Sequence, residues 1–369
     1  MAGDHPKTVI VLGAGASASE GAPLQADLFR EYFQSYRRRS EGQQYEEMDR
    51  ELATYFLLFW GIDVDHGDLA KARFPTFEEA LGLLEIAESR NEFFKDFAGL
   101  YPERTRGREM RSHLVNLIGR ILDEKLETWR GHHTRLINSI KESGRLPCTT
   151  FIGLNYDILI DRAISEETGS DPDYSVLAEP EDGQPYGPAE CGGEHVMLLK
   201  LHGSLNWLLC PTCNVLFFDR YEKSAVFRTE SVHRVSCPRC QEPRIPLIVP
   251  PTFFKLVSSY FLQSIWRAAE ERLKQADQIV FCGYSFPDAD VHVKYLLKRA
   301  EMNRPGGMPR PPKVFIVNEH ANKRRSERRQ ECKRYGRFFV NKGLVHWTKL
   351  SFEEFAENPS LIEDPRQWL

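Results

Sequence analysis

Two C-x-x-C pairs are the clearest chemical signal in this 369-residue sequence. Cys210 and Cys213 form the first pair, Cys237 and Cys240 form the second, and 23 residues separate the pairs. Four thiolates complete a tetrahedral zinc site and leave no position for a reacting water, so the pattern predicts a structural Zn²⁺. We expect this metal to hold together a small zinc-ribbon subdomain over residues 207–245.

Polar residues also follow short apolar runs, at the points where predicted strands end. Asn155 and Asp157 come after the run that starts at Cys148. The carboxyl ends of parallel strands meet at one edge of an open α/β sheet, and ligands bind there. We therefore expect both side chains at a ligand site. The residues alone leave a second interpretation open, in which they cap the helix that begins near Ile158.

His202 ends the next predicted strand, Val196–Leu201, and Gly203 follows it. An imidazole has an ordinary pKa of about 6.5, which suits a general base, and the glycine would let a ligand approach closely. A single histidine is more often structural than catalytic. Because His202 stands in a series of polar strand ends, we favour the catalytic interpretation.

The first strand end carries two glycines. Val9–Leu12 is an apolar run that suits a strand buried on both faces, and Gly13 and Gly15 follow it closely. The bare backbone of this turn, together with a helix that starts near Ala16, could hold a phosphate or pyrophosphate. A tight turn without a ligand is the alternative. No second strand with an acidic end follows about 20 residues later, which disfavours an ordinary nicotinamide dehydrogenase.

Two later apolar runs also end in polar residues. One leads into Gly283 and Ser285, and Lys313–Val317 leads into Asn318 and Glu319. Amide and carboxylate side chains at a strand end suit the hydroxyl groups of a sugar. We therefore expect Asn318 and Glu319 to bind a ribose.

The strands that carry these residues predict an α/β fold with a Rossmann-like parallel sheet. We assign residues 1–26 and 146–369 to this domain and residues 27–145 to a large helical insertion. Within the insertion, apolar residues recur at helical spacing, and Thr76 with Glu79 forms a capping-box pattern. After the zinc ribbon, we expect Pro246–Val249 to resume the main domain.

Overall composition gives no sign of a nucleic-acid or membrane protein. The formal net charge is −4, the isoelectric point is about 6.3, and no apolar run approaches the roughly 20 residues that span a bilayer. We expect a cytoplasmic protein without direct nucleic-acid contact. The segment Asn214–Val235 leaves that contact open as a minority interpretation, because it carries basic residues with Phe217, Phe218 and Phe227.

In their shared order, these motifs resemble those of the sirtuin-like SIR2-domain family. The motifs are G-A-G-A-S at Gly13–Ser17, N-Y-D at Asn155–Asp157, H-G at His202–Gly203, the two cysteine pairs, G-Y-S at Gly283–Ser285 and V-N-E at Val317–Glu319. The resemblance covers roughly residues 9–23 and 148–319. It implies a Rossmann-like domain that binds NAD, a small zinc domain, and cleavage of the nicotinamide–ribose bond.

The resemblance also implies roles for individual residues. The residues expected to bind NAD are Gly13, Ala14, Gly15, Ser17, Asp157, Gly283, Ser285, Asn318 and Glu319. Gly13, Ala14 and Ser17 would hold the phosphates, and Ser285, Asn318 and Glu319 would lie on the adenosine side. Asn155 would orient the attacking water, and His202 would act on the nicotinamide ribose.

The sequence departs from protein-deacylating sirtuins where those enzymes bind their substrate. Leu154 replaces a glutamine, and Pro250–Thr252 replaces the Phe-Gly-Glu that pairs with the acyl-lysine peptide. Proline has no N–H to donate to that peptide. The chain looks more like the bacterial SIR2 proteins that hydrolyse NAD in antiphage defence, which often form oligomers or work beside an ATPase, helicase or Argonaute partner.

We therefore predict an NAD hydrolase that forms a homo-oligomer and acts as the toxic effector of an antiphage system. An NAD-dependent protein deacylase is the alternative. A binding module with a degenerate nucleotide site is a third possibility.

Overall fold

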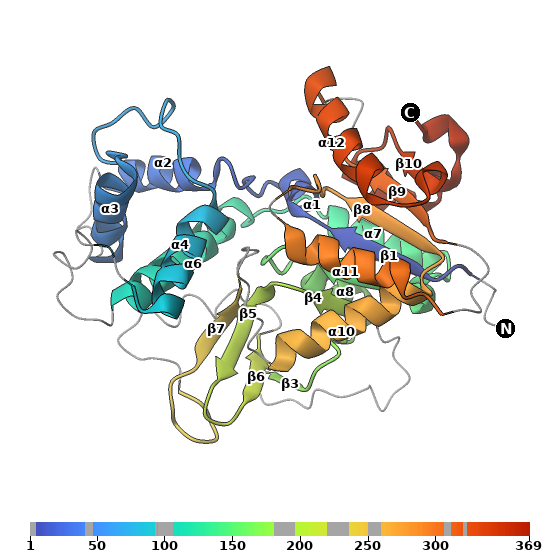
Figure 1. Cartoon of the computed structure of the whole chain (residues 1–369). Coiled ribbons are helices and arrows are strands. Elements are labelled where there is room, and N and C mark those ends of the chain that lie inside the picture. The colour runs from blue at the N-terminus through green and yellow to red at the C-terminus, as the bar shows by residue number, and fades with distance from the viewer. Residues whose placement is uncertain are drawn as a thin grey trace. The chain divides into compact units, whose positions relative to one another are not determined.

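The computed structural model describes residues 5–40, 47–92, 94, 106–180, 196–219, 236–249, 260–288, 290–305, 311–319 and 323–369 (Figure 1). The chain divides into two compact units. One contains the β-sheets and consists of Met1–Gly21, Trp129–Val249 and Lys255–Leu369; the other is helical and consists of Ala22–Thr128 and Pro250–Phe254.

A six-stranded parallel sheet forms the centre of the first unit, in the order β10-β9-β8-β1-β2-β4. The strands are β1 (Thr8–Leu12), β2 (Thr149–Gly153), β4 (Met197–Lys200), β8 (Gln278–Cys282), β9 (Lys313–Val317) and β10 (Val345–Trp347). Their near-continuous apolar sequences are typical of strands covered on both faces. The predicted α/β class with a parallel sheet is confirmed.

Helices cover both faces of this sheet. Figure 1 shows α10 (Tyr260–Gln275) and α11 (Val291–Met302) in front of the sheet, and α7 (His132–Glu142) behind it. α7 packs against α8 (Leu159–Thr168) and α13 (Phe352–Glu357). In the described part of this unit, the remaining helices are α1 (Ala14–Glu20), α12 (Arg325–Phe338) and four short 3₁₀ turns at Leu146–Cys148, Lys342–Leu344, Pro359–Glu363 and Pro365–Gln367.

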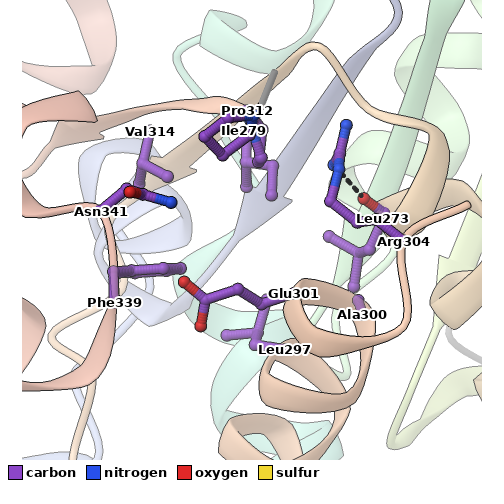
Figure 2. Close-up of a pocket in the computed structure, with 11 residues that line it drawn as sticks. Leu273, Ile279, Leu297, Ala300, Glu301, Arg304, Pro312, Val314, Phe339 and Asn341 are labelled. Carbon is purple, nitrogen blue, oxygen red and sulfur yellow. Dashed lines mark hydrogen bonds between the residues drawn. The ribbon is translucent and has the colours of Figure 1, made fainter. Parts of the chain in front are cut away.

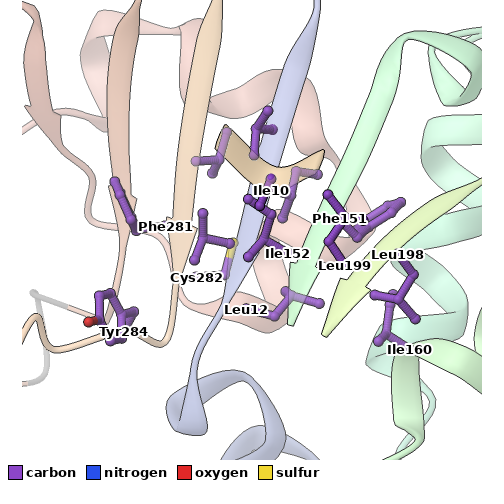
Figure 3. Close-up of a cluster of buried hydrophobic side chains, with 14 of the residues drawn as sticks. Ile10, Leu12, Phe151, Ile152, Ile160, Leu198, Leu199, Phe281, Cys282 and Tyr284 are labelled. Carbon is purple, nitrogen blue, oxygen red and sulfur yellow. The ribbon is translucent and has the colours of Figure 1, made fainter. Parts of the chain in front are cut away.

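The buried core of the first unit lies on the central strands. Figure 3 shows Ile10, Phe151, Leu198 and Phe281, from β1, β2, β4 and β8, packed in one cluster. All four are at most 2% exposed. At roughly 25 cal/mol for each Å² of apolar surface removed from water, such burial is the main favourable contribution to folding, and it fixes the strand ends in space.

A second sheet of four strands belongs to the same unit, in the order β3-β6-β5-β7. The strands are β3 (Ala178–Pro180), β5 (Gly203–Cys210), β6 (Val215–Phe218) and β7 (Ile245–Ile248). The strand expected at Pro246–Val249 thus pairs with β5 and not with the main sheet. Its apolar sequence predicts a strand. Its pairing with β5 depends on the close approach of the two backbones at Gly203.

The helical unit contains α2 (Leu28–Ser40), α3 (Glu47–Trp60), α4 (Phe77–Arg90) and α6 (Arg106–Lys125). The capping box before α4 is confirmed, because Glu79 N–H donates to the Thr76 hydroxyl at 3.2 Å and Thr76 N–H donates to the Glu79 carboxylate at 2.7 Å. The sequence places α7 in the helical insertion, but this helix lies in the sheet-containing unit. None of the helices in the described ranges is both long and apolar enough to cross a lipid bilayer.

Candidate functional site

Strand register brings the predicted site residues to one edge of the main sheet. Gly153 of β2 pairs with Lys200 of β4, so Asn155 and His202 each stand two residues beyond a paired position. Leu12 of β1 pairs with Gly153 on one side and with Cys282 of β8 on the other. The glycine turn, the N-Y-D loop, the H-G pair and the G-Y-S loop therefore begin at neighbouring points on the carboxyl edge, where α/β sheets bind ligands.

A chain of hydrogen bonds joins the N-Y-D loop to α1. The Asn155 amide nitrogen donates to Gly13 O at 2.9 Å and to Ser17 Oγ at 2.7 Å. The Ser17 hydroxyl donates in turn to Asp157 Oδ2 at 2.6 Å. Asp157 Oδ1 accepts from the N–H of Leu159, the first residue of α8, at 3.1 Å. Asp157 therefore stabilises the start of α8, as the capping interpretation predicts, and also bonds to Ser17 of α1.

Asn155 retains one polar atom for a ligand. Within the described part of the chain, its hydrogen bonds all come from the amide nitrogen, and the side-chain oxygen Oδ1 makes none. An amide oxygen is an acceptor with two lone pairs. The side chain is thus oriented by Gly13 and Ser17 while its oxygen stays able to accept a hydrogen bond.

The glycine turn is packed tightly against the loop that follows β8. A Cβ on Gly15 would lie 2.7 Å from the Cα of Gly283, and a Cβ on Gly13 would lie 2.8 Å from the Gly283 carbonyl oxygen. The amides of Gly13 and Gly15 donate to Cys282 O and Gly283 O at 2.9 and 2.8 Å. These glycines therefore serve the contact between two loops, and their own amides are used in that contact.

His202 is enclosed by three elements. The side chain is 2% exposed, and its ring centroid lies 6.3 Å from the rings of both Tyr156 and Trp266. The Trp266 indole donates to Leu201 O at 2.9 Å, and the amide of Val249 donates to His202 O at 2.9 Å. The N-Y-D loop, α10 and the end of β7 thus fix the position of the imidazole.

Gly203 serves the pairing of two strands. Its φ is 81°, in the left-handed region, and a Cβ at this position would lie 1.8 Å from the carbonyl oxygen of Leu247 in β7. Strand β7 fills the space that the sequence predicts for a ligand beside this glycine, which explains why β7 joins the smaller sheet.

On the expected adenosine side, Asn318 is engaged with the protein. Its side-chain oxygen accepts from the amide of Tyr284 at 3.1 Å, and its nitrogen donates to Tyr284 O at 2.7 Å and to Glu331. It therefore holds the loop after β8 in place. Ser285 and Glu319 are exposed and available to a ligand, and Glu319 has a left-handed φ of 49°.

Helix α12 contributes two residues, Glu331 and Tyr335, that no sequence motif indicated. The buried Glu331 carboxylate accepts from Asn318 and from Lys323, the latter at 2.6 Å. The Tyr335 hydroxyl donates to Tyr284 O at 2.6 Å, and burial raises the pKa of this phenol. Because α12 follows the strand ends in the sequence and meets them only through folding, no local pattern could have indicated these contacts.

The four predicted cysteines form one cluster. Their Sγ atoms all lie within 4.8 Å of one another, and Cys210 Sγ is 3.5 Å from Cys240 Sγ. Four sulfurs at about 2.3 Å from a tetrahedral zinc would be about 3.8 Å apart, so this set could hold a metal ion. Burial raises the pKa of Cys237, but backbone hydrogen bonds from Arg239 and Cys240 outweigh it and lower that pKa to about 7.

Two aromatic residues beside the cysteines are unavailable to nucleic acid. Phe217 and Phe218 in β6 are 2% and 1% exposed, so they cannot stack on bases. Phe227 lies outside the described residues, as do Pro250–Thr252. The minority interpretation of nucleic-acid contact through Phe217 and Phe218 is therefore wrong.

A small pocket lies at the opposite end of the main sheet. It is lined by Ile279 and Val314, the second residues of β8 and β9, and by side chains of α10 and α11 (Figure 2). Arg304 is fixed at its rim by hydrogen bonds to Leu273 O and Ala276 O. Among the described residues that line this pocket, none is a predicted site residue, so it is separate from the candidate site.

A family comparison decides the affiliation of the chain. The model of a SIR2-like domain matches residues 149–339. This chain belongs to the SIR2-like domain family. The matched range of the SIR2-like domain contains Asn155, His202 and all four clustered cysteines, and begins at the first residue of β2.

Solved structures of Sir2 proteins are similar to this SIR2-like chain over nearly its whole length. A Sir2 structure with a p53 peptide and NAD⁺ shares 14% sequence identity over 96% of this chain and 92% of its own, with a TM-score of 0.42. A structure reported for the mechanism and regulation of Sir2 enzymes shares 16% identity over 97% of this chain and 92% of its own, with a TM-score of 0.41. A comparison with curated protein sequences finds no match.

Proposed function

We propose that this chain hydrolyses NAD at the nicotinamide–ribose bond and releases ADP-ribose and nicotinamide. Membership in the SIR2-like family and the matching motifs at Asn155 and His202 support NAD as the substrate. The observation that carries the proposal is the orientation of Asn155, whose nitrogen is bonded to Gly13 and Ser17 while its oxygen remains an acceptor. Such an oxygen can hold an attacking water.

Hydrolysis of an N-glycosidic bond passes through an oxocarbenium-like state, which needs a positioned water and a group that handles charge on the ribose. In this proposal Asn155 Oδ1 accepts a hydrogen bond from the water, and His202 accepts a proton from a ribose hydroxyl. Ser285 and Glu319, which are exposed beside the β8 and β9 ends, bind the adenosine half. Asn318 supports binding of the adenosine half indirectly, because its hydrogen bonds to the main chain of Tyr284 position the loop that carries Ser285.

Two sequence departures favour water over an acyl-lysine peptide as the second reactant. Leu154 stands where deacylating sirtuins have a glutamine, and two prolines stand where those enzymes pair with the peptide backbone. Because a proline cannot donate a main-chain hydrogen bond, that pairing is lost at Pro250 and Pro251. A protein deacylase is the competing function.

We propose that the four-cysteine cluster binds one structural Zn²⁺. Four cysteine sulfurs would fill a tetrahedral zinc site, so no coordination position would be left for a substrate. The metal would stabilise the turns that follow β5 and precede β7, and β5 begins directly after His202. It would therefore support the site through the fold and take no part in the reaction.

The proposed cellular role is NAD depletion as a defence against phage, as the resemblance to bacterial SIR2 effectors suggests. Expression of the active chain should then lower cellular NAD and arrest growth under activating conditions, and His202→Ala should abolish both effects. Growth arrest by both proteins at unchanged NAD would contradict this role.

Product analysis separates the hydrolase from the deacylase. The purified chain is incubated with NAD, with and without an acetylated lysine peptide, and the products are identified by mass spectrometry. ADP-ribose formed at the same rate in both reactions supports hydrolysis. Turnover that requires the peptide and gives O-acetyl-ADP-ribose would establish deacylation instead.

A further inference from the structure

Lys200, the last residue of β4, is a buried cation between the two loops that carry Asn155 and His202. Its side chain is 1% exposed. The ammonium donates to Asp161 Oδ2 at 2.9 Å, to Ser204 Oγ at 2.6 Å and to the main-chain oxygen of Asp157. An ammonium has three N–H donors, so every donor of Lys200 has an acceptor.

The partners of Lys200 are also buried and bonded. Asp161, in the first turn of α8, is 2% exposed, and its second carboxylate oxygen accepts from the Tyr174 hydroxyl at 2.6 Å. Ser204 is fully buried. A buried ion pair in which each polar group is bonded has one preferred geometry, because any displacement leaves a charge uncompensated.

This network joins the two site loops at equivalent points. Asp157 lies two residues after Asn155, and Ser204 lies two residues after His202. Lys200 bonds to both, and one backbone hydrogen bond, from Leu205 N to Tyr156 O at 2.9 Å, runs parallel to it. The Lys200 side chain therefore joins the N-Y-D loop to the H-G pair, together with this backbone hydrogen bond.

We propose that Lys200 and Ser204 are positioning residues, which hold Asn155 and His202 at the separation that NAD cleavage requires. The proposal rests on the proposed function of those two residues. Lys200 has no path to the substrate, since its ammonium is enclosed and all its protons are shared with protein oxygens. Lys200 acts through its contacts with Asp157 and Ser204, which set the positions of Asn155 and His202. These positions matter because displacement of a reacting group by about 1 Å can lower the rate about 100-fold.

Ser204→Ala is the sharpest test, because it frees one loop while leaving the Lys200–Asp161 ion pair intact. Tyr174→Phe is the matched control: it removes the hydroxyl that donates to Asp161 of α8 in the same buried network. The Tyr174 ring packs against Trp207 at 5.0 Å, and a phenylalanine keeps that contact. Both variants should lower the melting temperature by a similar amount.

The two variants should differ in turnover. We expect Ser204→Ala to lower kcat for NAD cleavage about tenfold or more, with KM changed less than about twofold, since NAD contacts remain. Tyr174→Phe should keep kcat within about twofold, and Ser204→Thr, which restores the hydroxyl, should recover most of the loss. Equal kcat values for Ser204→Ala and Tyr174→Phe would overturn the proposal.

Hydrogen–deuterium exchange tests the same proposal without turnover. Ser204→Ala should exchange faster than Tyr174→Phe at residues 154–158 and 201–206, and unchanged exchange there would overturn the positioning role. If the wild-type chain does not cleave NAD but the exchange difference is found, the proposed hydrolase function fails while the structural link between the loops stands.

Discussion

The Asn155 amide nitrogen lies 2.7 Å from Ser17 Oγ, although 138 residues separate them in the sequence. Ser17 accepts this bond and donates its own proton to Asp157 at 2.6 Å. One hydroxyl on α1 thus orients two residues of the N-Y-D loop. The glycine turn, α1 and the N-Y-D loop are therefore linked by hydrogen bonds. In the proposed reaction, these bonds orient the Asn155 oxygen.

Ser17→Ala should impair catalysis more than its small volume change suggests. The substitution leaves the Asn155 nitrogen with one acceptor and Asp157 Oδ2 without its donor, which costs about 1–3 kcal/mol of stability and at least about tenfold in kcat. Ser19→Ala is the control on the same helix, because among the described residues the Ser19 hydroxyl bonds to Ala16 O alone. Thermal unfolding measures the loss of stability, and NAD turnover measures the loss of kcat. Equal losses in Ser17→Ala and Ser19→Ala would contradict the role of Ser17.

Asn318→Ala should weaken NAD binding without slowing the reaction of bound NAD. The change frees the main chain of Tyr284, which shapes the loop beside Ser285. We expect KM for NAD to rise about tenfold, the equivalent of about one hydrogen bond, with kcat nearly unchanged. Glu327→Ala, an exposed change on α12, should leave both constants as they are. A fall in kcat at constant KM would place Asn318 in the reaction instead.

Glu20 predicts a specific loss of stability in acid. Its buried carboxylate accepts from Arg130 N at 2.8 Å and from the backbone and ring nitrogens of His133, each at 2.9 Å. Burial raises its pKa, but the hydrogen bonds and charge of His133 outweigh that effect and lower the pKa from 4.5 to about 2. Because the pKa of Glu20 is lower in the folded state than in the unfolded state, ionisation of this carboxyl stabilises the folded protein above pH 4.5. This stabilisation disappears as the pH falls toward 2.

This contribution is on the order of 3 kcal/mol at neutral pH. Glu20→Gln should therefore lower the free energy of unfolding at pH 6 and lower it much less at pH 3, as measured by urea denaturation. Glu142→Gln, an exposed change on α7, provides the control. A deficit of the same size at both pH values would show that the Glu20 carboxylate is not ionised preferentially in the folded state.

Cys237→Ser should remove the metal. We expect about one zinc per wild-type chain by elemental analysis, loss of that zinc in the variant, and a melting temperature lower by roughly 10 °C, because a structural zinc contributes several kcal/mol to folding. Cys332→Ser on α12 should keep the metal and the melting temperature. A wild-type chain without zinc, or a variant that retains it, would refute the structural zinc site.

Much of the fold could be predicted because buried parallel strands have short, nearly continuous apolar sequences. Lys313–Val317 forms a strand with the predicted boundaries, and Asn155 meets the glycine turn at Gly13, as its place after a parallel strand requires. The partner of β7 could not be predicted, since an apolar strand fits either sheet and the choice depends on Gly203.

Parts of the site also depend on contacts that the sequence does not show. Lys200 is the charged last residue of an apolar strand, and such a residue is usually exposed. Its burial depends on the bonds to Asp161 and Ser204, which form only when the chain folds. Glu331 reaches Asn318 from a helix that is mostly basic and polar in sequence. The glycines of the first turn show that a motif can be recognised correctly while its local role differs, because the space beside them is filled by the backbone of Gly283.

The most direct test of the central claim is the rate of nicotinamide release from NAD by the wild-type chain and by Asn155→Ala, with NAD affinity measured in parallel by calorimetry. If Asn155 orients the attacking water, the variant should release nicotinamide at least about 100-fold more slowly while its Kd for NAD changes only a few-fold. Release at the wild-type rate by Asn155→Ala would contradict the account, whatever the effect on affinity.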